Sequence, residues 1–318
     1  MKKRFLIVGD NHMDSKTPQS RLDNYMESCL MELSETLQIA KAVKADYYIL
    51  LGDVFNRIEV GGECRNRALE ILSSDNGTPW PFEKYVVIGN HDIAHNPSYI
   101  GKSALQTLIS ANVIKEGLTD EDLSISFYHF TPKLDEQLLE GVLKDDPSKM
   151  IFLHASITDK PSRFEHILFK DLQLNEKTKV VVSGHIHAPM EATREDGVKF
   201  FNPGCLGRTE VSEQHAPQVL LIQYDYDNNH IEHKHFMLKN SLKADVVFDI
   251  DKSKQKKQDN KNTEAFISAV TNISISDTTS GDMEQDFRAF AENRNVNDSV
   301  IKTVIETINI IKTGGTLS

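Results

Sequence analysis

The chain has 318 residues, of which 39% are hydrophobic, and this is enough for one large core with a smaller unit attached. Its formal net charge of −11 argues against a protein that binds nucleic acid alone through a broad basic surface. It has no apolar stretch of about 18 residues that could span a membrane, and its three cysteines, without C-x-x-C spacing, indicate a reduced, cytoplasmic protein.

Five short apolar runs along the chain are predicted to be strands. They cover residues 5–8, 47–51, 85–88, 151–153 and 180–182. Helices are predicted over 21–43 and 63–73, between the first three runs, and over 103–111, after the third. This alternation of strands and helices indicates an α/β fold.

Polar side chains follow each of the five predicted strands. The signatures are Asp10-Asn11-His12, Gly52-Asp53, Gly89-Asn90-His91-Asp92, His154 and Gly184-His185-Ile186-His187. Because the carboxyl ends of parallel strands meet at one edge of an open α/β sheet, we expect these side chains to share one site.

The residue types in this set predict a metal site. Asp, Asn and His together suit Mn²⁺, Fe²⁺ or Zn²⁺ better than Ca²⁺, which prefers oxygen ligands alone. Seven candidate ligands are too many for one tetrahedral ion but suit two ions that share a carboxylate, and Asp53 is the natural bridge. The candidates are Asp10, His12, Asp53, Asn90, His154, His185 and His187, with His91 as an extra histidine.

Such a site suits hydrolysis by a metal-activated water, and hydrolysis of phosphate esters agrees with these residue types. A metal lowers the pKa of bound water from about 15.7 toward about 7, which supplies hydroxide near neutral pH. Nucleophilic covalent catalysis is disfavoured, since the chain has no Gly-x-Ser-x-Gly signature.

The set of motifs, which covers residues 1 to about 190, resembles that of the calcineurin-like metallophosphoesterase superfamily. One branch is closer: Phe201-Asn202-Pro203-Gly204-Cys205-Leu206-Gly207-Arg208, followed by Glu213, resembles the segment after the last metal motif of SbcD-type DNA repair and recombination nucleases. The resemblance implies a two-sheet α/β sandwich with four layers in the order αββα, a small C-terminal α/β cap and terminal helices.

The resemblance also implies a role for each site residue. Asp10, His12, Asp53 and His187 would hold the first metal, and Asp53, Asn90, His154 and His185 the second. Two divalent ions, with Mn²⁺ as the expected metal, are thus implied as cofactors. His91 would not bind metal but would face the scissile phosphate and stabilise its charge or protonate the leaving oxygen.

The chain departs from the family pattern at position 56. Related enzymes often place His or Asp there, whereas Asn56 could orient His91 but could not charge it. Arg57 is either a contact for substrate phosphate or half of a surface salt bridge. Asp92 is included as a neighbour of the site. Cys205 stands where the branch usually has Ser, and we interpret it as a half-buried turn residue.

Two further histidines, His233 and His235, have an i, i+2 spacing that could form a metal face on a strand. The segment alternates like a solvated edge strand and shows no nearby carboxylate partner in the sequence. We therefore expect these residues to be ordinary surface histidines.

The chain is predicted to have three parts. These are a metallophosphoesterase (nuclease) domain over 1–243, a capping segment over 244–281 and a helix pair over 282–318. The cap would open with a strand over 244–250 and contain the basic segment 252–261, either a solvated loop or a nucleic-acid contact. The helix pair carries apolar stripes, which either pack on the cap or dock onto a partner. The stripes are Met283, Phe287 and Phe290, then Val300, Val304, Ile308 and Ile311, widened by Ile301 and Ile305.

The preferred function is a two-metal DNA nuclease subunit. By the resemblance it works as a homodimer bound to an SbcC-like coiled-coil ATPase, which together form a heterotetramer on DNA, and such a partner would compensate for the acidic charge. The alternatives are the same chemistry on a small nucleotide or a phosphoprotein, and a binding scaffold with little catalysis. The cap and terminal helices favour the nuclease, because a small substrate needs neither.

Overall fold

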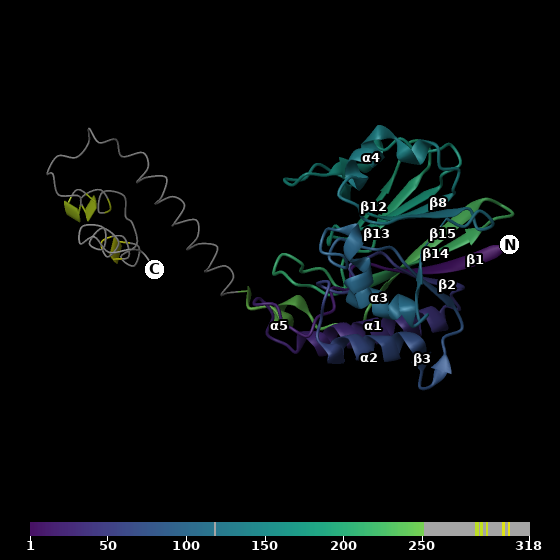
Figure 1. Cartoon of the computed structure of the whole chain (residues 1–318). Coiled ribbons are helices and arrows are strands. Elements are labelled where there is room, and N and C mark those ends of the chain that lie inside the picture. The colour runs from purple at the N-terminus through teal and green to yellow at the C-terminus, as the bar shows by residue number, and fades with distance from the viewer. Residues whose placement is uncertain are drawn as a thin grey trace. The chain divides into compact units, whose positions relative to one another are not determined.

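The computed structural model describes residues 1–117 and 119–250, together with Glu284, Gln285, Phe287, Arg288, Ala291, Ile301, Lys302 and Ile305. The chain divides into two compact units, Met1–Asp249 and Ile250–Ser318. The larger unit holds all five polar signatures (Figure 1).

The first large sheet has six strands in the order β15-β14-β1-β2-β5-β6. Its strands are β1 (Lys2–Val8), β2 (Tyr47–Leu50), β5 (Glu83–Val86), β6 (Lys115–Glu116), β14 (Gln218–Asp225) and β15 (His230–Met237). β1, β2, β5 and β6 are parallel to one another, while β14 pairs antiparallel with β1 and β15 antiparallel with β14. The N-terminal strand therefore lies inside the sheet, between β2 and β14.

The second large sheet has five strands in the order β12-β13-β11-β8-β7. Its strands are β7 (Ile125–Tyr128), β8 (Met150–His154), β11 (Val180–Gly184), β12 (Met190–Thr193) and β13 (Lys199–Asn202). All are parallel except β12, which pairs antiparallel with β13. Two small ribbons complete the strands: β3 (Ser74–Asp75) with β4 (Thr78–Pro79), and β9 (Ile157–Thr158) with β10 (Ile167–Leu168).

The three predicted helices are confirmed with small changes at their ends. The helices are α1 (Tyr25–Ala42), α2 (Gly62–Ser73), α3 (Ala104–Ser110), α4 (Leu134–Glu140) and α5 (Ala244–Val247), with 3₁₀ turns η1 (Pro97–Lys102), η2 (Val142–Lys144) and η3 (Phe169–Asp171). Helix α1 begins four residues later than predicted because Asn24 caps it by accepting a hydrogen bond from the backbone N–H of Glu27. Ser103 caps α3 in the same way.

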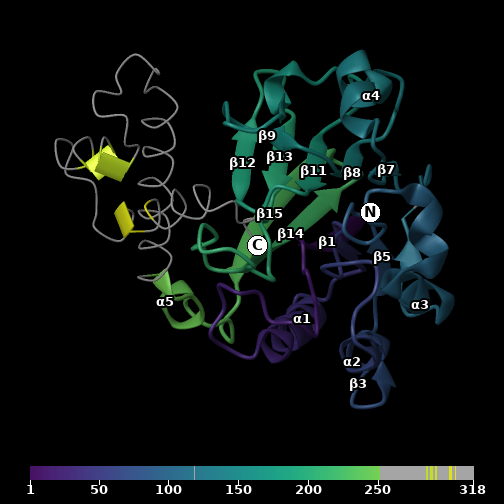
Figure 2. The ribbon, with the colours of Figure 1, turned by 60° about the vertical axis from the view of Figure 1, so that its left-hand side comes forward.

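Three buried apolar clusters separate four layers. Alternate residues of β1 serve two of them: Leu6 and Val8 pack with α1 and α2, while Phe5 and Ile7 pack against the second sheet. The third cluster joins the outer face of the second sheet to α4 through residues such as Leu138. Figures 1 and 2 show α1 to α3 on one side of the two sheets and α4 on the other. The predicted two-sheet α/β sandwich is confirmed.

The strand predicted over 244–250 is wrong. Residues Ala244–Val247 form the short helix α5, and the carbonyl of Val247 accepts a hydrogen bond from the N–H of Leu22. Val247 and Phe248 are buried in the larger unit while Val246 is 54% exposed. A short apolar run does not distinguish helix from strand, and here the contacts with the segment before α1 decide.

Most of the predicted cap and helix pair lies outside the described residues, including the basic segment 252–261. The described residues of the second unit are helical, and Phe287, Ala291 and Ile305 bury one another with Ile301 beside them. Phe287 with Ala291 and Ile301 with Ile305 have the i, i+4 spacing of neighbours on a helix. The other residues of the predicted stripes, Met283, Phe290, Val300, Val304, Ile308 and Ile311, lie outside the described residues.

Within the described ranges, none of the helices combines the length and apolar character needed to cross a membrane. The three cysteines are unpaired and buried.

Candidate metal centre

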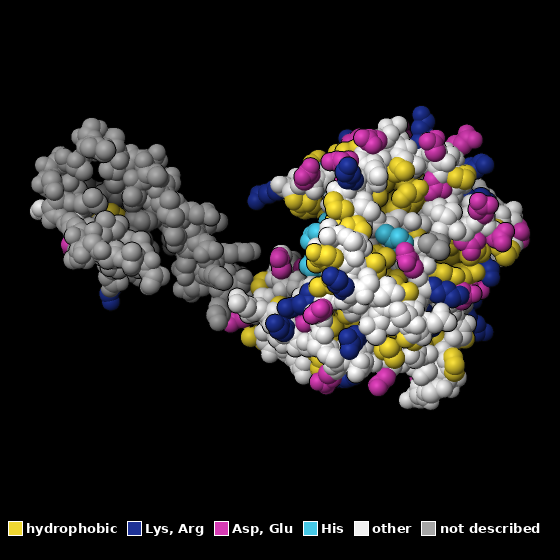
Figure 3. Space-filling model, viewed as in Figure 1, with side chains coloured by type: hydrophobic (Ala, Val, Ile, Leu, Met, Phe, Trp, Pro, Cys, Tyr) yellow, Lys and Arg dark blue, Asp and Glu magenta, His cyan; other side chains and the backbone are white. Residues whose placement is uncertain are grey.

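The predicted ligands converge at the carboxyl ends of five parallel strands, β1, β2, β5, β8 and β11. The side chains form two groups, one of Asp10, His12 and His187 and one of Asp53, His154 and His185. Asn90 joins the second group, since its Oδ1 lies 2.9 Å from both His154 Nε2 and His185 Nδ1. Figure 3 shows histidine side chains at the surface of the larger unit, with Lys and Arg side chains close by.

Asp53 faces both groups. Its Oδ2 lies 3.4 Å from His154 Nε2 in one group and 3.8 Å from His12 Nε2 in the other. The two groups also touch elsewhere, because His154 Nδ1 lies 3.9 Å from an oxygen of Asp10. This is the placement that a carboxylate shared by two ions requires.

The spacing of the donor atoms fits bound metal ions. Atoms that bind one ion at about 2.1 Å with angles between 90° and 109° lie about 3.0 to 3.4 Å apart. His12 Nε2 lies 2.9 Å from His187 Nε2, and the contacts of Asn90 and Asp53 fall close to this range. A cation bound between two imidazole nitrogens at this distance would stabilise both of them. The roles of these residues as ligands remain a prediction.

The far nitrogens of two histidines are held by hydrogen bonds. His154 Nδ1 donates to the carbonyl of Leu51 at 2.8 Å, and His187 Nδ1 donates to the carboxylate of Glu213. Each bond holds a proton on Nδ1, so Nε2 is the nitrogen that would bind an ion once its own proton is released. The ligand atoms are thus oriented before an ion binds.

The charges of the site suit cations. Burial lowers the pKa of His12 to about 3 and that of His185 to about 3, so both rings are neutral and can offer a nitrogen lone pair to a metal ion. Burial would raise the pKa of the Asp53 carboxyl, but the charge of His154 outweighs it and holds that pKa below its usual value. Burial raises the pKa of Asp10 to about 6. A divalent ion would favour the ionised form of this carboxyl as well.

Backbone geometry at the strand ends is unusual. His12, Asp53 and His185 have φ of 47°, 45° and 77°, in the left-handed region that residues other than glycine rarely adopt. Gly89 is required next to them, because a Cβ there would lie 2.2 Å from Oδ1 of Asp53. Such strain concentrates at functional sites, where surrounding contacts hold it.

His91 lies at the edge of the first group, with its ring centroid 4.8 Å from that of His12. Its Nδ1 donates to the backbone carbonyl of Asn56 at 2.8 Å, which turns Nε2 away from the protein backbone. The sequence suggested that the side chain of Asn56 would orient His91, but the backbone of that residue does so. The geometry also groups His91 with His12 and Asp53, so its exclusion from the metal ligands rests on the resemblance.

The side chains of Asn56 and Arg57 both bind Asp14. Asn56 Nδ2 donates to Asp14 Oδ2 at 3.3 Å, and Arg57 Nε donates to the same oxygen at 2.7 Å. Asp14 is almost fully buried and was not among the predicted site residues. Arg57 is therefore a salt-bridge partner in this structure, and its guanidinium remains 43% exposed.

Asp92 is a structural neighbour of the site. Its oxygens accept hydrogen bonds from the backbone N–H groups of Gly89 and Phe55, which ties the loop after β5 to the loop after β2. Burial and the charge of Asp53 raise the pKa of Asp92 to about 8.

The segment 201–213, which carries the nuclease-type resemblance, supports His187. The backbone N–H of Cys205 donates to the carbonyl of His187 at 3.0 Å, and Glu213 holds the ring. Arg208 is buried and donates to the carbonyl of Leu242, so its role is structural. Cys205 is buried, and burial raises the pKa of its thiol well above the usual value, which agrees with an inert turn residue.

Replacing Glu213 with Gln should weaken metal binding without removing a ligand. Loss of the charge weakens the hydrogen bond that Glu213 accepts from the His187 ring, since a neutral amide oxygen is a poorer acceptor than a carboxylate, and changes of this kind reduce affinity by about 10-fold to 100-fold. Mn²⁺ titration by calorimetry measures the effect. Glu210→Gln, an exposed residue of the same loop, is the matched control. An affinity equal to that of the unaltered protein would exclude a positioning role for Glu213.

The comparisons with known proteins give one sequence family and a set of solved structures. The family described as calcineurin-like phosphoesterase matches residues 3–189, more than half of the chain. No curated protein matches the chain.

Three of the similar structures illustrate the level of likeness. A dimetal phosphatase from Danio rerio is 12% identical with a TM-score of 0.41, and the match covers 74% of this chain and 98% of that one. A putative 5'-nucleotidase from Staphylococcus aureus is 13% identical with a TM-score of 0.43, and the match covers 81% of this chain and 58% of that one. Vps29 complexed with Zn²⁺ from Entamoeba histolytica is 12% identical with a TM-score of 0.32, and the match covers 74% of this chain and 98% of that one. These values are too low to indicate a shared substrate.

Proposed function

Because the chain belongs to the calcineurin-like phosphoesterase family, whose members are metal-dependent hydrolases, we propose that it is a two-metal nuclease that hydrolyses phosphodiester bonds of DNA. The observation that carries the proposal is the position of Asp53 between two groups of imidazole and oxygen donors. Two divalent ions, with Mn²⁺ as the expected metal, would polarise the phosphate and make water an effective nucleophile near neutral pH.

The residues of the chain supply binding and proton transfer. Asp10, His12, Asp53 and His187 would hold one ion, and Asn90, His154 and His185 would hold the other together with Asp53. His91 projects from the loop after β5 with its Nδ1 bonded to the Asn56 carbonyl. A protonated Nε2 would stabilise the phosphate or protonate the leaving oxygen, and the carbonyl accepts from Nδ1 in either charge state.

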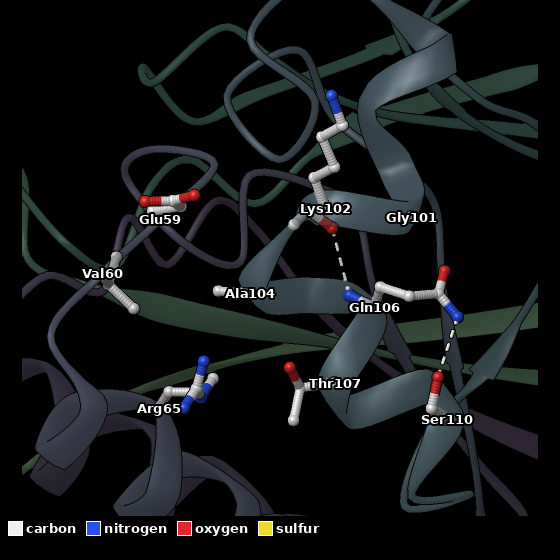
Figure 4. Close-up of a pocket in the computed structure, with 10 residues that line it drawn as sticks. Glu59, Val60, Arg65, Gly101, Lys102, Ala104, Gln106, Thr107 and Ser110 are labelled. Atoms are coloured by element: carbon white, nitrogen blue, oxygen red, sulfur yellow. Dashed lines mark hydrogen bonds between the residues drawn. The ribbon is translucent and has the colours of Figure 1, made fainter.

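A polar pocket close to the site supports an extended substrate. It has a volume of about 470 Å³, and Figure 4 shows Arg65 of α2 opposite Thr107 of α3, with Lys102 above them. Arg65 Nε is buried and finds no hydrogen-bond partner among the described residues. Glu59 also lines the pocket, and the ammonium group of Lys102 points away from Arg65 (Figure 4), so the pocket offers one inward cation, one exposed cation beside it and one carboxylate. Cationic groups of this kind bind phosphates of a nucleic-acid backbone.

The pocket is within reach of a strand bound at the metal site. Three peptide steps separate Asn56, which touches His91, from Glu59 in the pocket, and they span at most about 11 Å. One DNA strand rises about 3.4 Å per nucleotide, so this is a distance of about three nucleotides. We expect a phosphate a few nucleotides from the cut to reach this pocket, whereas a mononucleotide bound at the metal site would not.

Substrate comparison is the primary test. With Mn²⁺, linear duplex and single-stranded DNA should be cleaved, and bis-p-nitrophenyl phosphate and cyclic nucleotides should be turned over more slowly. Efficient turnover of only the small substrates would replace the nuclease proposal with a small-substrate phosphodiesterase or phosphatase. The absence of turnover of every substrate by metal-loaded protein would favour a binding scaffold.

Removal of the pocket cations separates the two substrate classes further. The double variant Arg65→Ala, Lys102→Ala should raise KM for DNA by about 10-fold or more, because contacts with DNA phosphates are lost. The slope of log affinity against log salt concentration should also fall by about one for each lost contact. Its kcat/KM for bis-p-nitrophenyl phosphate should not change. Lys177→Ala, an exposed lysine before β11 at the opposite end of that strand from His185, is the control. Equal losses on both substrates would contradict a role for the pocket in DNA binding.

The proposed partners are a second copy of the chain and an SbcC-like coiled-coil ATPase. The acidic charge of −11 supports a partner that holds most of the duplex. Deletion of residues 282–318 should abolish co-purification with such an ATPase while cleavage of small substrates remains. Unchanged co-purification would assign these residues to packing within the second unit, where Phe287, Ala291 and Ile305 already cluster.

A further inference from the structure

A cluster of metal-binding side chains lies apart from the site described above. It consists of Glu191 on β12 and of His233 and His235 on β15, whose donor atoms all lie within 4.8 Å of one another. His233 Nε2 lies 2.9 Å from Glu191 Oε1, and His235 Nε2 lies 3.4 Å from Glu191 Oε2. The sequence predicted solvated histidines without a carboxylate partner, and Glu191 is that partner, from the other sheet.

The strand registers aim these side chains at each other. His233 and His235 stand opposite Ile222 and Leu220 of β14, which point into the core between the two sheets. Residues directly opposite in an antiparallel pair share a face, so both histidines face the second sheet.

The same reasoning places Glu191 on the inner face of its own sheet. It stands opposite Phe201 of β13, whose side chain belongs to the core between the sheets. The ring of His233 packs on Phe201 with centroids 4.7 Å apart. All three polar side chains are therefore at positions that would otherwise take apolar residues.

The hydrogen bonds of the cluster leave donors and acceptors unused. The two histidine side chains are 22% and 25% exposed, and His235 Nδ1 is buried with no hydrogen-bond partner among the described residues. The Glu191 side chain is 46% exposed, which leaves one side of the cluster open to water. Lys234, between the two histidines, points to the opposite face of the strand and does not compete for the carboxylate.

We propose that Glu191, His233 and His235 form a separate binding site for a zinc ion that links the edges of the two sheets. Two imidazole nitrogens and a carboxylate are a known zinc ligand set, with water in the fourth position. β12 and β15 are the outermost strands of their sheets, and bound zinc would connect them. This site is independent of the proposed nuclease activity.

Zinc content at equilibrium tests the proposal. Metal-stripped protein is dialysed against micromolar Zn²⁺, and zinc per chain is measured by mass spectrometry. Glu191→Gln and His233→Ala should each bind one zinc fewer per chain than the unaltered protein. His230→Ala is the matched control, because His230 lies on the same strand and pairs with exposed Glu232.

A background without the shared carboxylate of the first site separates the two sites. In Asp53→Asn protein, adding His233→Ala should lower the zinc content by one ion per chain, and the zinc-dependent rise in Tm should decrease with it. Circular dichroism verifies that each variant is folded. Equal zinc content in the unaltered protein, Glu191→Gln and His233→Ala would overturn the proposal and leave the cluster as a pair of hydrogen bonds between sheets.

Discussion

Asp53→Asn should bind fewer metal ions than the unaltered protein and should lose nearly all of its cleavage activity. The substitution preserves the size of the side chain but removes the charge that faces both ligand groups, 3.4 Å from His154 and 3.8 Å from His12. We expect a decrease in kcat/KM on the order of 10⁴-fold, or about 5 kcal/mol of barrier, with fewer than two ions bound per chain. Metal analysis after dialysis against Mn²⁺ and DNA cleavage at saturating Mn²⁺ measure the two effects.

The control for Asp53→Asn is Asp171→Asn, which makes the same replacement at an exposed carboxylate in η3. It should retain two ions and full activity. The interpretation of Asp53 as a bridge does not survive if Asp53→Asn retains two ions and more than a tenth of the cleavage rate.

His91→Ala should lose cleavage while keeping both ions. The His91 ring lies beside His12, and proton transfer by a positioned histidine contributes about 10²-fold to 10⁴-fold to rate. We expect a loss of that size in kcat, measured by DNA cleavage at saturating Mn²⁺. DNA with a better leaving group at the cut, namely a bridging sulfur in place of the leaving oxygen, should be less affected because a thiolate leaves without protonation.

The neighbouring His95 provides a matched control. Its ring centroid is 6.2 Å from that of His91, and its φ of 59° favours Asn as the replacement. His95→Asn should cleave at the normal rate. If His91→Ala is fully active, His91 has no part in the reaction, and if it loses an ion, His91 is a ligand of the first group.

The fold and the main site were predictable because both follow local rules. Each ligand comes directly after a short apolar strand, and the carboxyl ends of neighbouring parallel strands meet, so Asp10, Asp53 and Asn90 could be placed together from β1, β2 and β5. His187 follows a strand of the other sheet, and only the family resemblance grouped it with Asp10. Three helices were predictable from their apolar periodicity, although the cap at Asn24 shortened the first of them. Helix α4 was not predicted, and α5 was misread as a strand, since its run of apolar residues is too short to show a period.

Contacts between side chains distant in sequence could not be predicted. Glu213 binds His187 across 26 residues, and Arg57 binds Asp14 across 43. Glu191 meets His233 only because two separate sheets pack face to face. No periodicity in the sequence encodes such pairs, and those around the site are the ones that orient His187, Asn56 and Arg57.

The position of β1 inside its sheet determines the order in which the protein can mature. This strand is made long before β14, with which it pairs, and Asp10 at its end needs His187, which is 177 residues later. A chain still emerging from the ribosome can form β1, β2 and β5 but not the complete ligand set. Contacts this distant slow folding, so the unfinished domain waits with exposed strand edges until β14 is available. Acquisition of metal is therefore expected to be a late event, after synthesis of the whole larger unit.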